Sequence, residues 1–331
     1  MTTVGRKADH LRIAAGPDVG HAGGTGFERV RLRHRALPER DLDEVSLETS
    51  LLGATLGAPL VVSAMTGGTE EAGRINAELA RAACEEGLAL VLGSGRALLE
   101  DPALLETYRS ADRPPLLLGN LGAAQVVLPD APTRAERLVE LLDADGLSIH
   151  LNPIQEAVQP EGEPRFAGVA AGIAAVVAHL APRPVVVKEV GFGMDAADVA
   201  LLSDAGVAAI DVAGAGGTNW ALVEGRRDER AGDVAAAFAD WGVPTADALA
   251  DAHAAAPSLP LIASGGLRDG VDAAKALALG ATAAGLARPF LLAAQAGTAS
   301  ATAATLVRQL RVAVWACGAA SAAALGPEHL R

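Results

Sequence analysis

The sequence predicts an α/β fold, a (β/α)8 TIM barrel with an N-terminal extension, and three observations favour it. The chain has 331 residues, 50% of them hydrophobic, which suits one large barrel with extensions. From Pro59 onward, short apolar runs alternate with Ala-rich segments of helical length, and there are eight such units. A doubly wound sheet usually has fewer units and a G-x-G-x-x-G turn after its first strand, whereas Met-Thr-Gly-Gly at 65–68 follows the first run here.

Residues 1–58 are interpreted as an N-terminal extension, because they carry dense charge and several glycines in an irregular pattern. Within 29–35, arginine alternates with apolar residues, which predicts an exposed strand. The first residues lack the apolar segment of a secretory signal.

The barrel is placed at 59–300, and each predicted strand is followed by a turn and a segment of helical length. The runs Pro-Val-Val-Val at 184–187 and Pro-Leu-Ile-Ala at 260–263 do not alternate, as expected for parallel strands buried on both faces. The predicted strands are 60–63, 89–92, 116–119, 146–149, 185–188, 208–212, 261–263 and 283–286. Residues 301–331 are expected to form a C-terminal helical tail.

Composition argues against some classes of partner. With 27 Lys+Arg against 40 Asp+Glu, the net charge is −13, and aromatic residues make up 3% of the chain, so no nucleic acid is expected to bind and the partner is expected to be a small molecule. The apolar stretch 312–325 is shorter than the roughly 18 to 20 residues of a membrane span. Two cysteines, Cys84 and Cys317, form neither a disulfide framework nor a zinc motif, which favours a cytoplasmic location.

Glycines and polar residues directly follow the predicted strands, at the end of the barrel where enzymes of this fold carry their active sites. These segments are 65–68, 93–96, 120–123, 150–156, 188–191, 214–220, 264–268 and 287–289. Amides, hydroxyls and cations are therefore expected to converge on one rim.

The last loops of this rim predict a phosphate site. Gly265 and Gly266 precede a helix, and Arg288 follows one unit later, so backbone N–H groups and a helix N-terminus would approach an anion. Residues 216–218 add a third set of donors. The alternative is that these glycines only form tight turns.

Lys188 ends an apolar strand, where a buried ammonium requires a counter-charge or a ligand. One interpretation is a salt bridge with Glu189 or another rim carboxylate. The other is a flavin site, in which a lysine here stabilises the anionic reduced ring. Met65, Thr66 and Asn120 would then supply further contacts to the ring.

Five segments together resemble one enzyme family. They are Arg-Lys-Ala-Asp-His at 6–10, Ala-Met-Thr-Gly-Gly at 64–68, His-Leu-Asn-Pro-Ile-Gln-Glu-Ala-Val-Gln-Pro-Glu-Gly at 150–162, Lys-Glu-Val-Gly at 188–191 and Ala-Gly-Ala-Gly-Gly-Thr-Asn-Trp at 213–220. The chain is similar over nearly its whole length to the type 2 isopentenyl diphosphate isomerases, flavoenzymes that interconvert isopentenyl and dimethylallyl diphosphate. The match is weakest after Gln295.

The resemblance implies an FMN site and a prenyl diphosphate site. The implied FMN contacts are Ala64, Met65, Thr66, Ser94, Asn120, Lys188, Ala213, Thr218, Gly265, Gly266, Leu267, Ala287 and Arg288. The implied substrate contacts are Arg6, Lys7, His10, Ser94, Arg96 and Gln155, with the diphosphate on Arg6, Lys7, Ser94 and Arg96. Taken alone, Arg6 and Lys7 would read as a solvated terminal charge pair.

The resemblance also implies a mechanism, in which reduced FMN is both acid and base and NADPH only reduces the flavin. Gln155, His150 and Asn152 would be catalytic neighbours of the prenyl group, and Glu156 would be the single carboxylate ligand of Mg²⁺. Without the resemblance, His150 would read as a structural histidine and Glu156 as a surface charge. Similar enzymes form tetramers and octamers, so a homo-oligomer is expected.

Two alternatives stay open at this point. An FMN-dependent 2-hydroxy-acid oxidase would need a histidine and an arginine after a late strand, and 212–220 contains neither. A non-enzymatic flavin-binding protein would not require a cationic N-terminal arm facing a cluster of His, Asn, Gln and Glu side chains.

Overall fold

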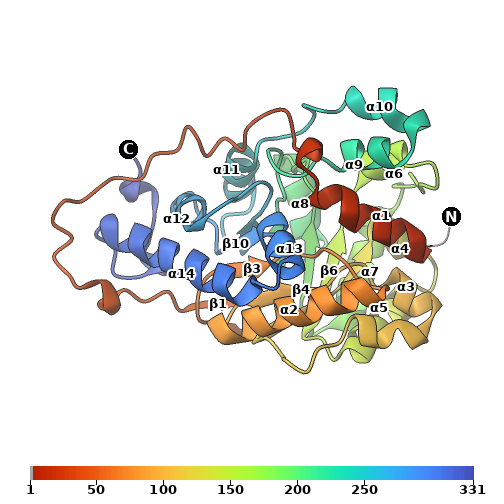
Figure 1. The fold of residues 1–331 in the computed structure, drawn as a ribbon, viewed down its shortest axis with the longest axis horizontal. Coiled ribbons are helices and arrows are strands. Elements are labelled where there is room, and N and C mark those ends of the chain that lie inside the picture. The colour runs from red at the N-terminus through yellow and green to blue at the C-terminus, as the bar shows by residue number, and fades with distance from the viewer. Residues whose placement is uncertain (1–2) are drawn as a thin grey trace.

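The structure is a computed structural model that describes residues 3–331, and its centre is a closed barrel of parallel strands (Figure 1). Around the barrel the strands follow the order β10-β3-β4-β5-β6-β7-β8-β9. Their bounds are β3 (Leu60–Val62), β4 (Ala89–Val91), β5 (Leu116–Gly122), β6 (Gly146–His150), β7 (Val185–Lys188), β8 (Ala209–Asp211), β9 (Leu261–Ala263) and β10 (Ala283–Leu286). The predicted TIM barrel is confirmed.

Helices connect the strands and surround them. They are α2 (Glu70–Glu86), α3 (Arg96–Glu100), α4 (Ala123–Val126), α5 (Ala131–Leu142), α6 (Pro153–Val158), α7 (Val169–Leu180), α8 (Ala196–Asp204), α9 (Trp220–Arg227), α10 (Gly232–Ala236), α11 (Thr245–Ala255), α12 (Gly270–Ala278), α13 (Arg288–Gln295) and α14 (Ala299–Ala316). Several begin where a side chain caps the first backbone N–H groups. Thr69 accepts from Ala72 N, and Asp269 accepts from the N–H groups at 271 and 272.

Alternation along the strands separates an apolar interior near their amino ends from a polar interior at their carboxyl ends. Val186 packs in the inner cluster of the barrel, whereas Val185 and Val187 pack against the outer helices. At the amino ends of the strands, the hairpin of β1 (Thr49–Leu51) and β2 (Ala54–Leu56) closes the barrel with Leu51 and Leu56. Two residues further along the inner face, at the carboxyl ends of the strands, the inner positions are polar: Ser63, Asn120, Ser148, Lys188, Asp211 and Ser264.

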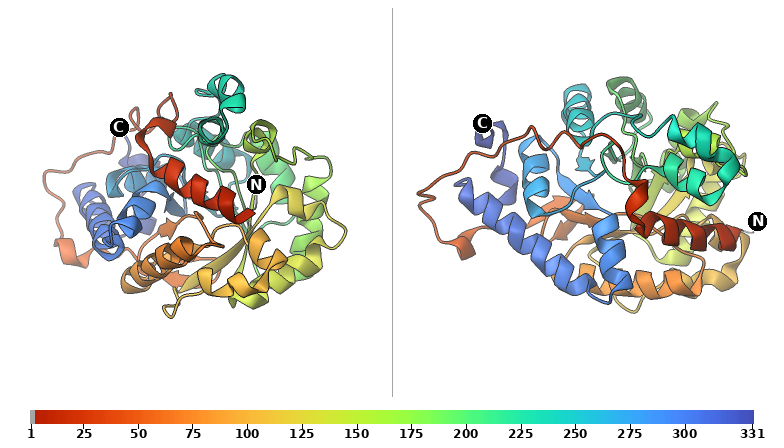
Figure 2. Two further views of the ribbon diagram at one scale, coloured as in Figure 1. Left: turned by 45° about the vertical axis from the view of Figure 1, so that its right-hand side comes forward. Right: turned by 45° about the horizontal axis from the view of Figure 1, so that its top comes forward.

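The N-terminal extension begins with a helix that the sequence analysis did not predict. This helix, α1 (Thr3–Ala15), lies across the carboxyl end of the barrel and contacts α9 and α13 (Figure 2). The chain then runs away from the barrel mouth, with short 3-10 turns η1 (Pro17–Val19) and η2 (Leu42–Glu44).

The strand predicted within 29–35 is wrong. Only an isolated bridge between Leu32 and Leu330 forms there. The segment lies beside the C-terminal end of the chain, where Arg33 N donates to His329 O at 2.7 Å and Arg331 N donates to Arg31 O at 3.0 Å. Because no regular strand lies alongside this segment in the described structure, the alternating arginines belong to an exposed irregular segment and not to a sheet.

The C-terminal helix α14 completes the outer ring by packing against α2 and α12. The predicted boundary between barrel and tail, at 300/301, therefore falls inside a helix of this ring. No helix among residues 3–331 is both long enough and apolar enough to cross a membrane.

Candidate active site

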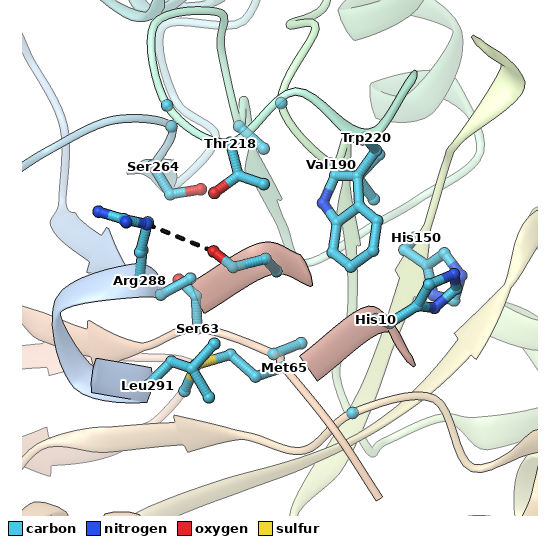
Figure 3. Close-up of a pocket in the computed structure, with 18 of the residues that line it drawn as sticks. His10, Ser63, Met65, His150, Val190, Thr218, Trp220, Ser264, Arg288 and Leu291 are labelled. Carbon is cyan, nitrogen blue, oxygen red and sulfur yellow. Dashed lines mark hydrogen bonds between the residues drawn. The ribbon is translucent and has the colours of Figure 1, made fainter. Parts of the chain in front are cut away.

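A cavity of about 670 Å³ opens at the carboxyl ends of the strands, beneath α1 (Figure 3). All the residues that the sequence analysis assigned to a site line this one cavity: Arg6, Lys7, His10, Ala64, Met65, Thr66, Ser94, Arg96, Asn120, His150, Asn152, Gln155, Glu156, Lys188, Ala213, Thr218, Gly265, Gly266, Leu267, Ala287 and Arg288. Their individual roles stay predictions.

The walls of the cavity differ in polarity. Figure 3 shows Trp220 and Val190 along one side and Met65 and Leu291 along another, so part of its lining is apolar. The His10 and Trp220 rings meet edge to face, with centroids 5.3 Å apart.

Glycines after β8 and β9 allow two loops to pack backbone against backbone. A Cβ on Gly265 would lie 2.1 Å from Gly214 O, and one on Gly266 would lie 2.5 Å from Gly216 O. Both residues also have positive φ, +105° and +75°. Tight packing of the loops is thus sufficient to require these glycines, while both residues still line the cavity.

Arg288 ties this end of the cavity to α1. Its Nε donates to Ala14 O at 3.3 Å, and its Nη2 donates to Ala15 O and Gly16 O, both at 3.1 Å. These carbonyls form the C-terminal end of α1, which carries negative partial charge. The guanidinium predicted to meet a phosphate therefore also caps the helix that covers the cavity, and Nη1 takes no part in these bonds.

Lys188 does not form the salt bridge that was the alternative to a ligand. It is 8% exposed and donates to the backbone carbonyl of Glu189 at 2.5 Å. In the described part of the chain it makes no ion pair with a carboxylate. The Glu189 carboxylate turns instead to backbone N–H groups at 190–193, and burial raises its pKa to about 7. Asp211, beside Lys188 in the barrel, accepts from Ser264 Oγ at 2.6 Å.

His150 is held as a neutral imidazole. Burial, with Lys188 and Lys7 nearby, lowers its pKa to about 3. Its Nδ1 lies 2.6 Å from Asn120 Oδ1, and because that amide oxygen accepts, the ring proton sits on Nδ1. His150 is therefore a positioning or hydrogen-bonding group at neutral pH and not a proton donor of imidazolium strength.

Glu224, which the sequence analysis missed, organises the next part of the wall. It is fully buried on α9 and accepts from Gln155 Nε2 at 2.8 Å and from Arg227 Nε at 2.7 Å, while His10 Nε2 lies 2.9 Å away. Burial opposes its ionisation, but these three donors hold the pKa of Glu224 below its usual value. Its spacing of four residues from Trp220, one helical turn, is the signal that could have found it.

Glu156 is the centre of a second network. Its Oε1 accepts from Asn152 Nδ2 at 3.1 Å, and its Oε2 accepts from Gln159 Nε2 at 2.9 Å and from Glu163 N at 2.7 Å. Asn152 Oδ1 is buried and makes no hydrogen bond to the described residues. Among residues 3–331 no three His, Cys, Asp or Glu side chains gather around a metal position. A carboxylate with an unpartnered amide oxygen fits Mg²⁺, which takes its other ligands from water and phosphate.

The cationic end of the cavity lies under the first half of α1. Lys7 Nζ donates to Ser94 O at 2.8 Å and to Tyr108 Oη at 2.7 Å, and Tyr108 was not anticipated from the sequence. Arg96 pairs with Glu100 and with Glu163, each at 2.9 Å.

Comparisons with known proteins show the family to which the chain belongs. A family model described as FMN-dependent dehydrogenase matches residues 164–331. The isopentenyl-diphosphate delta-isomerase of Stutzerimonas stutzeri (strain A1501) is 51% identical over 293 residues, covering 87% of this chain and 84% of that protein. The enzyme of the same name from Xanthobacter autotrophicus (strain ATCC BAA-1158 / Py2) is 52% identical, covering 85% of this chain and 83% of its own.

Among solved structures, a mutant flavocytochrome b2 with benzoylformate superposes with a TM-score of 0.70 at 17% identity, covering 98% of this chain and 82% of its own. Identity at this level shows the shared barrel alone. It does not favour the 2-hydroxy-acid oxidase alternative over the isomerase.

Proposed function

The chain belongs to the isopentenyl-diphosphate delta-isomerase family and is an FMN-dependent enzyme that interconverts isopentenyl and dimethylallyl diphosphate, and we propose that the cavity beneath α1 is its active site. The observation that carries this proposal is that a cationic surface and an apolar surface line the same cavity. Arg6, Lys7 and Arg96 supply a cationic end suited to a diphosphate, and Trp220 and Val190 supply an apolar wall suited to a prenyl chain.

FMN would be held between the loops that follow β3, β4, β5, β7, β8, β9 and β10. Two observations support this fit: Lys188 is a buried cation without a carboxylate partner among the described residues, and Ser63 Oγ is a buried hydroxyl without any partner there. When bound and reduced, the flavin would supply the acid and base chemistry that the shift of the double bond requires. Lys188 would stabilise negative charge on the ring, and the loops at 265–267 and 287–288 would meet its phosphate.

The other residues of the proposed site orient the prenyl group and exclude water. The Gln155 amide donates to Glu224 and accepts from Asn152 Nδ2 at 3.0 Å, so both of its ends are fixed. An amide is neither acid nor base at neutral pH, so the role of Gln155 is to position. His10 joins the same network through Glu224, and α1 lines the cavity in which the substrate would lie.

Glu156 would hold one Mg²⁺ together with the substrate diphosphate, with Asn152 Oδ1 beside it. NADPH would serve only to reduce the flavin. We also propose a homo-oligomer, a tetramer or octamer, in the cytoplasm, as in similar enzymes.

An isotope experiment tests the proposed chemistry. Purified protein with FMN, isopentenyl diphosphate, Mg²⁺ and NADPH in D₂O is expected to yield dimethylallyl diphosphate that carries deuterium, without stoichiometric NADPH consumption. Omitting Mg²⁺ is expected to reduce the rate strongly. NADPH consumed one-for-one with product would instead identify a reductase.

A further inference from the structure

Tyr108 is a buried residue that contacts the lining of the cavity through Lys7, and neither the sequence motifs nor the proposed mechanism accounts for it. It is the one tyrosine of the chain, follows the 3-10 turn η3 (Pro102–Thr107) and is 2% exposed. The ring fits closely against the loop after β3, because a Cβ on Gly67 would lie 2.0 Å from its Cε1. Its position is therefore fixed by packing and not by the ligand.

The Tyr108 hydroxyl is bonded on both sides. It donates to Ser94 O at 2.8 Å, which leaves its oxygen to accept from Lys7 Nζ at 2.7 Å. Lys7 Nζ also donates to Ser94 O at 2.8 Å and lies 5.2 Å from the centre of the Tyr108 ring. The ammonium is thus held between a hydroxyl and a carbonyl.

These partners of Lys7 are all electrically neutral. In the part of the chain that the structure describes, no carboxylate lies within ion-pair distance of Lys7, and Arg6 is its neighbour on the same helix. Burial, together with Arg6, lowers the pKa of Lys7 to about 7. Burial and Glu100 raise the pKa of Tyr108, so its hydroxyl stays neutral. A cation placed in a cavity wall with only neutral partners is suited to an anionic ligand that supplies the missing charge.

A purely structural role does not explain the hydroxyl. A phenylalanine would fill the same space without the cost of removing an OH group from water. In this position the OH accepts the hydrogen bond from Lys7 Nζ and so fixes its ammonium.

We propose that Tyr108 is a positioning residue, which holds the Lys7 ammonium in place for the diphosphate of the substrate. This inference rests on the proposed function, in which Lys7 binds that diphosphate. It predicts that the hydroxyl of Tyr108 contributes to substrate binding only when Lys7 is present.

The first test is Tyr108→Phe in the FMN-loaded enzyme, which keeps the ring and removes the hydroxyl. KM for isopentenyl diphosphate is expected to rise about tenfold, because a hydrogen bond to a charged group is lost, while kcat changes little. FMN affinity and thermal unfolding report on the fold and are expected to stay near those of the parent. A fall in kcat with an unchanged KM would overturn the proposal.

A double-mutant cycle with Lys7→Met separates the inference from the function on which it rests. Lys7→Met alone is expected to raise KM, and Tyr108→Phe is expected to add nothing in that background. If Lys7→Met leaves KM unchanged, the proposed role of Lys7 in diphosphate binding is wrong. If Lys7→Met raises KM, the proposed role of Tyr108 is wrong when Tyr108→Phe has no effect on KM in the parent enzyme, or when its full effect persists in the Lys7→Met background.

The pH dependence of KM is a further test, because a loss of packing alone would not change it. The charged or titratable groups around Lys7 are Arg6, Glu100, Tyr108 and His150, and His150 is neutral throughout this range. The parent enzyme is expected to lose affinity as pH rises through about 7, where Lys7 loses its proton. Because the hydroxyl stabilises the ammonium, this loss is expected to begin at lower pH in Tyr108→Phe. The titration of the substrate itself is common to both enzymes, so identical profiles would contradict the proposal.

Discussion

The floor of the cavity and its cover are held by different kinds of interaction. On the floor, Lys188 ends β7 and Ser264 directly follows β9, and the register of these strands is fixed by the ladder of the closed barrel. The cover, α1, has no such ladder and depends on a few side-chain contacts along its length, although its own Leu11 and Ile13 are buried. Figure 2 shows this helix lying over the barrel end as a separate element.

Three contacts anchor α1, at its beginning, middle and end. Lys7 is bound by Tyr108, His10 lies against Glu224, and the C-terminal carbonyls accept from Arg288. The floor should therefore tolerate local change without moving, whereas one substitution should loosen the cover. Substitutions in the two regions should consequently affect chemistry and substrate binding, respectively.

The largest effect is expected on the floor. Lys188→Ala removes the cation proposed to stabilise the reduced ring, and kcat is expected to fall about 10²- to 10³-fold, as when one preorganised donor is lost. FMN titration followed by absorbance is expected to show weaker binding of the reduced form. Normal turnover and normal FMN affinity would return Lys188 to a structural role.

A smaller effect is expected where floor and cover meet. Gln155→Ala is expected to lower kcat by about 10²-fold through lost positioning, without preventing flavin reduction by NADPH. Stopped-flow reduction measures the second part separately. A variant that neither turns over nor reduces its flavin would show that Gln155 has a broader role.

The smallest effect is expected at the cover. Arg288→Lys cannot reproduce the fork that binds the carbonyls at 14–16, so amide exchange within α1 is expected to accelerate about tenfold in FMN-saturated enzyme. The exposed Arg12 on the same helix pairs with Asp9, and Arg12→Ala is the matched control, expected to leave exchange near that of the parent. Equal exchange in both variants would remove Arg288 as an anchor of α1.

The barrel and much of its rim could be predicted from the sequence because their signals are local. An apolar run such as 185–188 marks a strand buried on both faces, and the residue that ends it must lie at the rim. The same local reasoning failed at 29–35, where the alternation was present but no partner strand lay alongside. A strand requires a neighbour, and the pattern of one segment carries no information about it.

By itself, the sequence determined the strands and thus the rim segments after them that face the cavity. The tertiary structure alone decided how those side chains are held. Lys7 and Tyr108 are 101 positions apart, and Gln155 and Glu224 are 69 apart, so no spacing or motif connects them. The tertiary structure likewise decided that Arg288 reaches the end of α1. These pairings depend on where folding brings distant segments together, because a buried polar group takes whichever partner the packed chain places within reach.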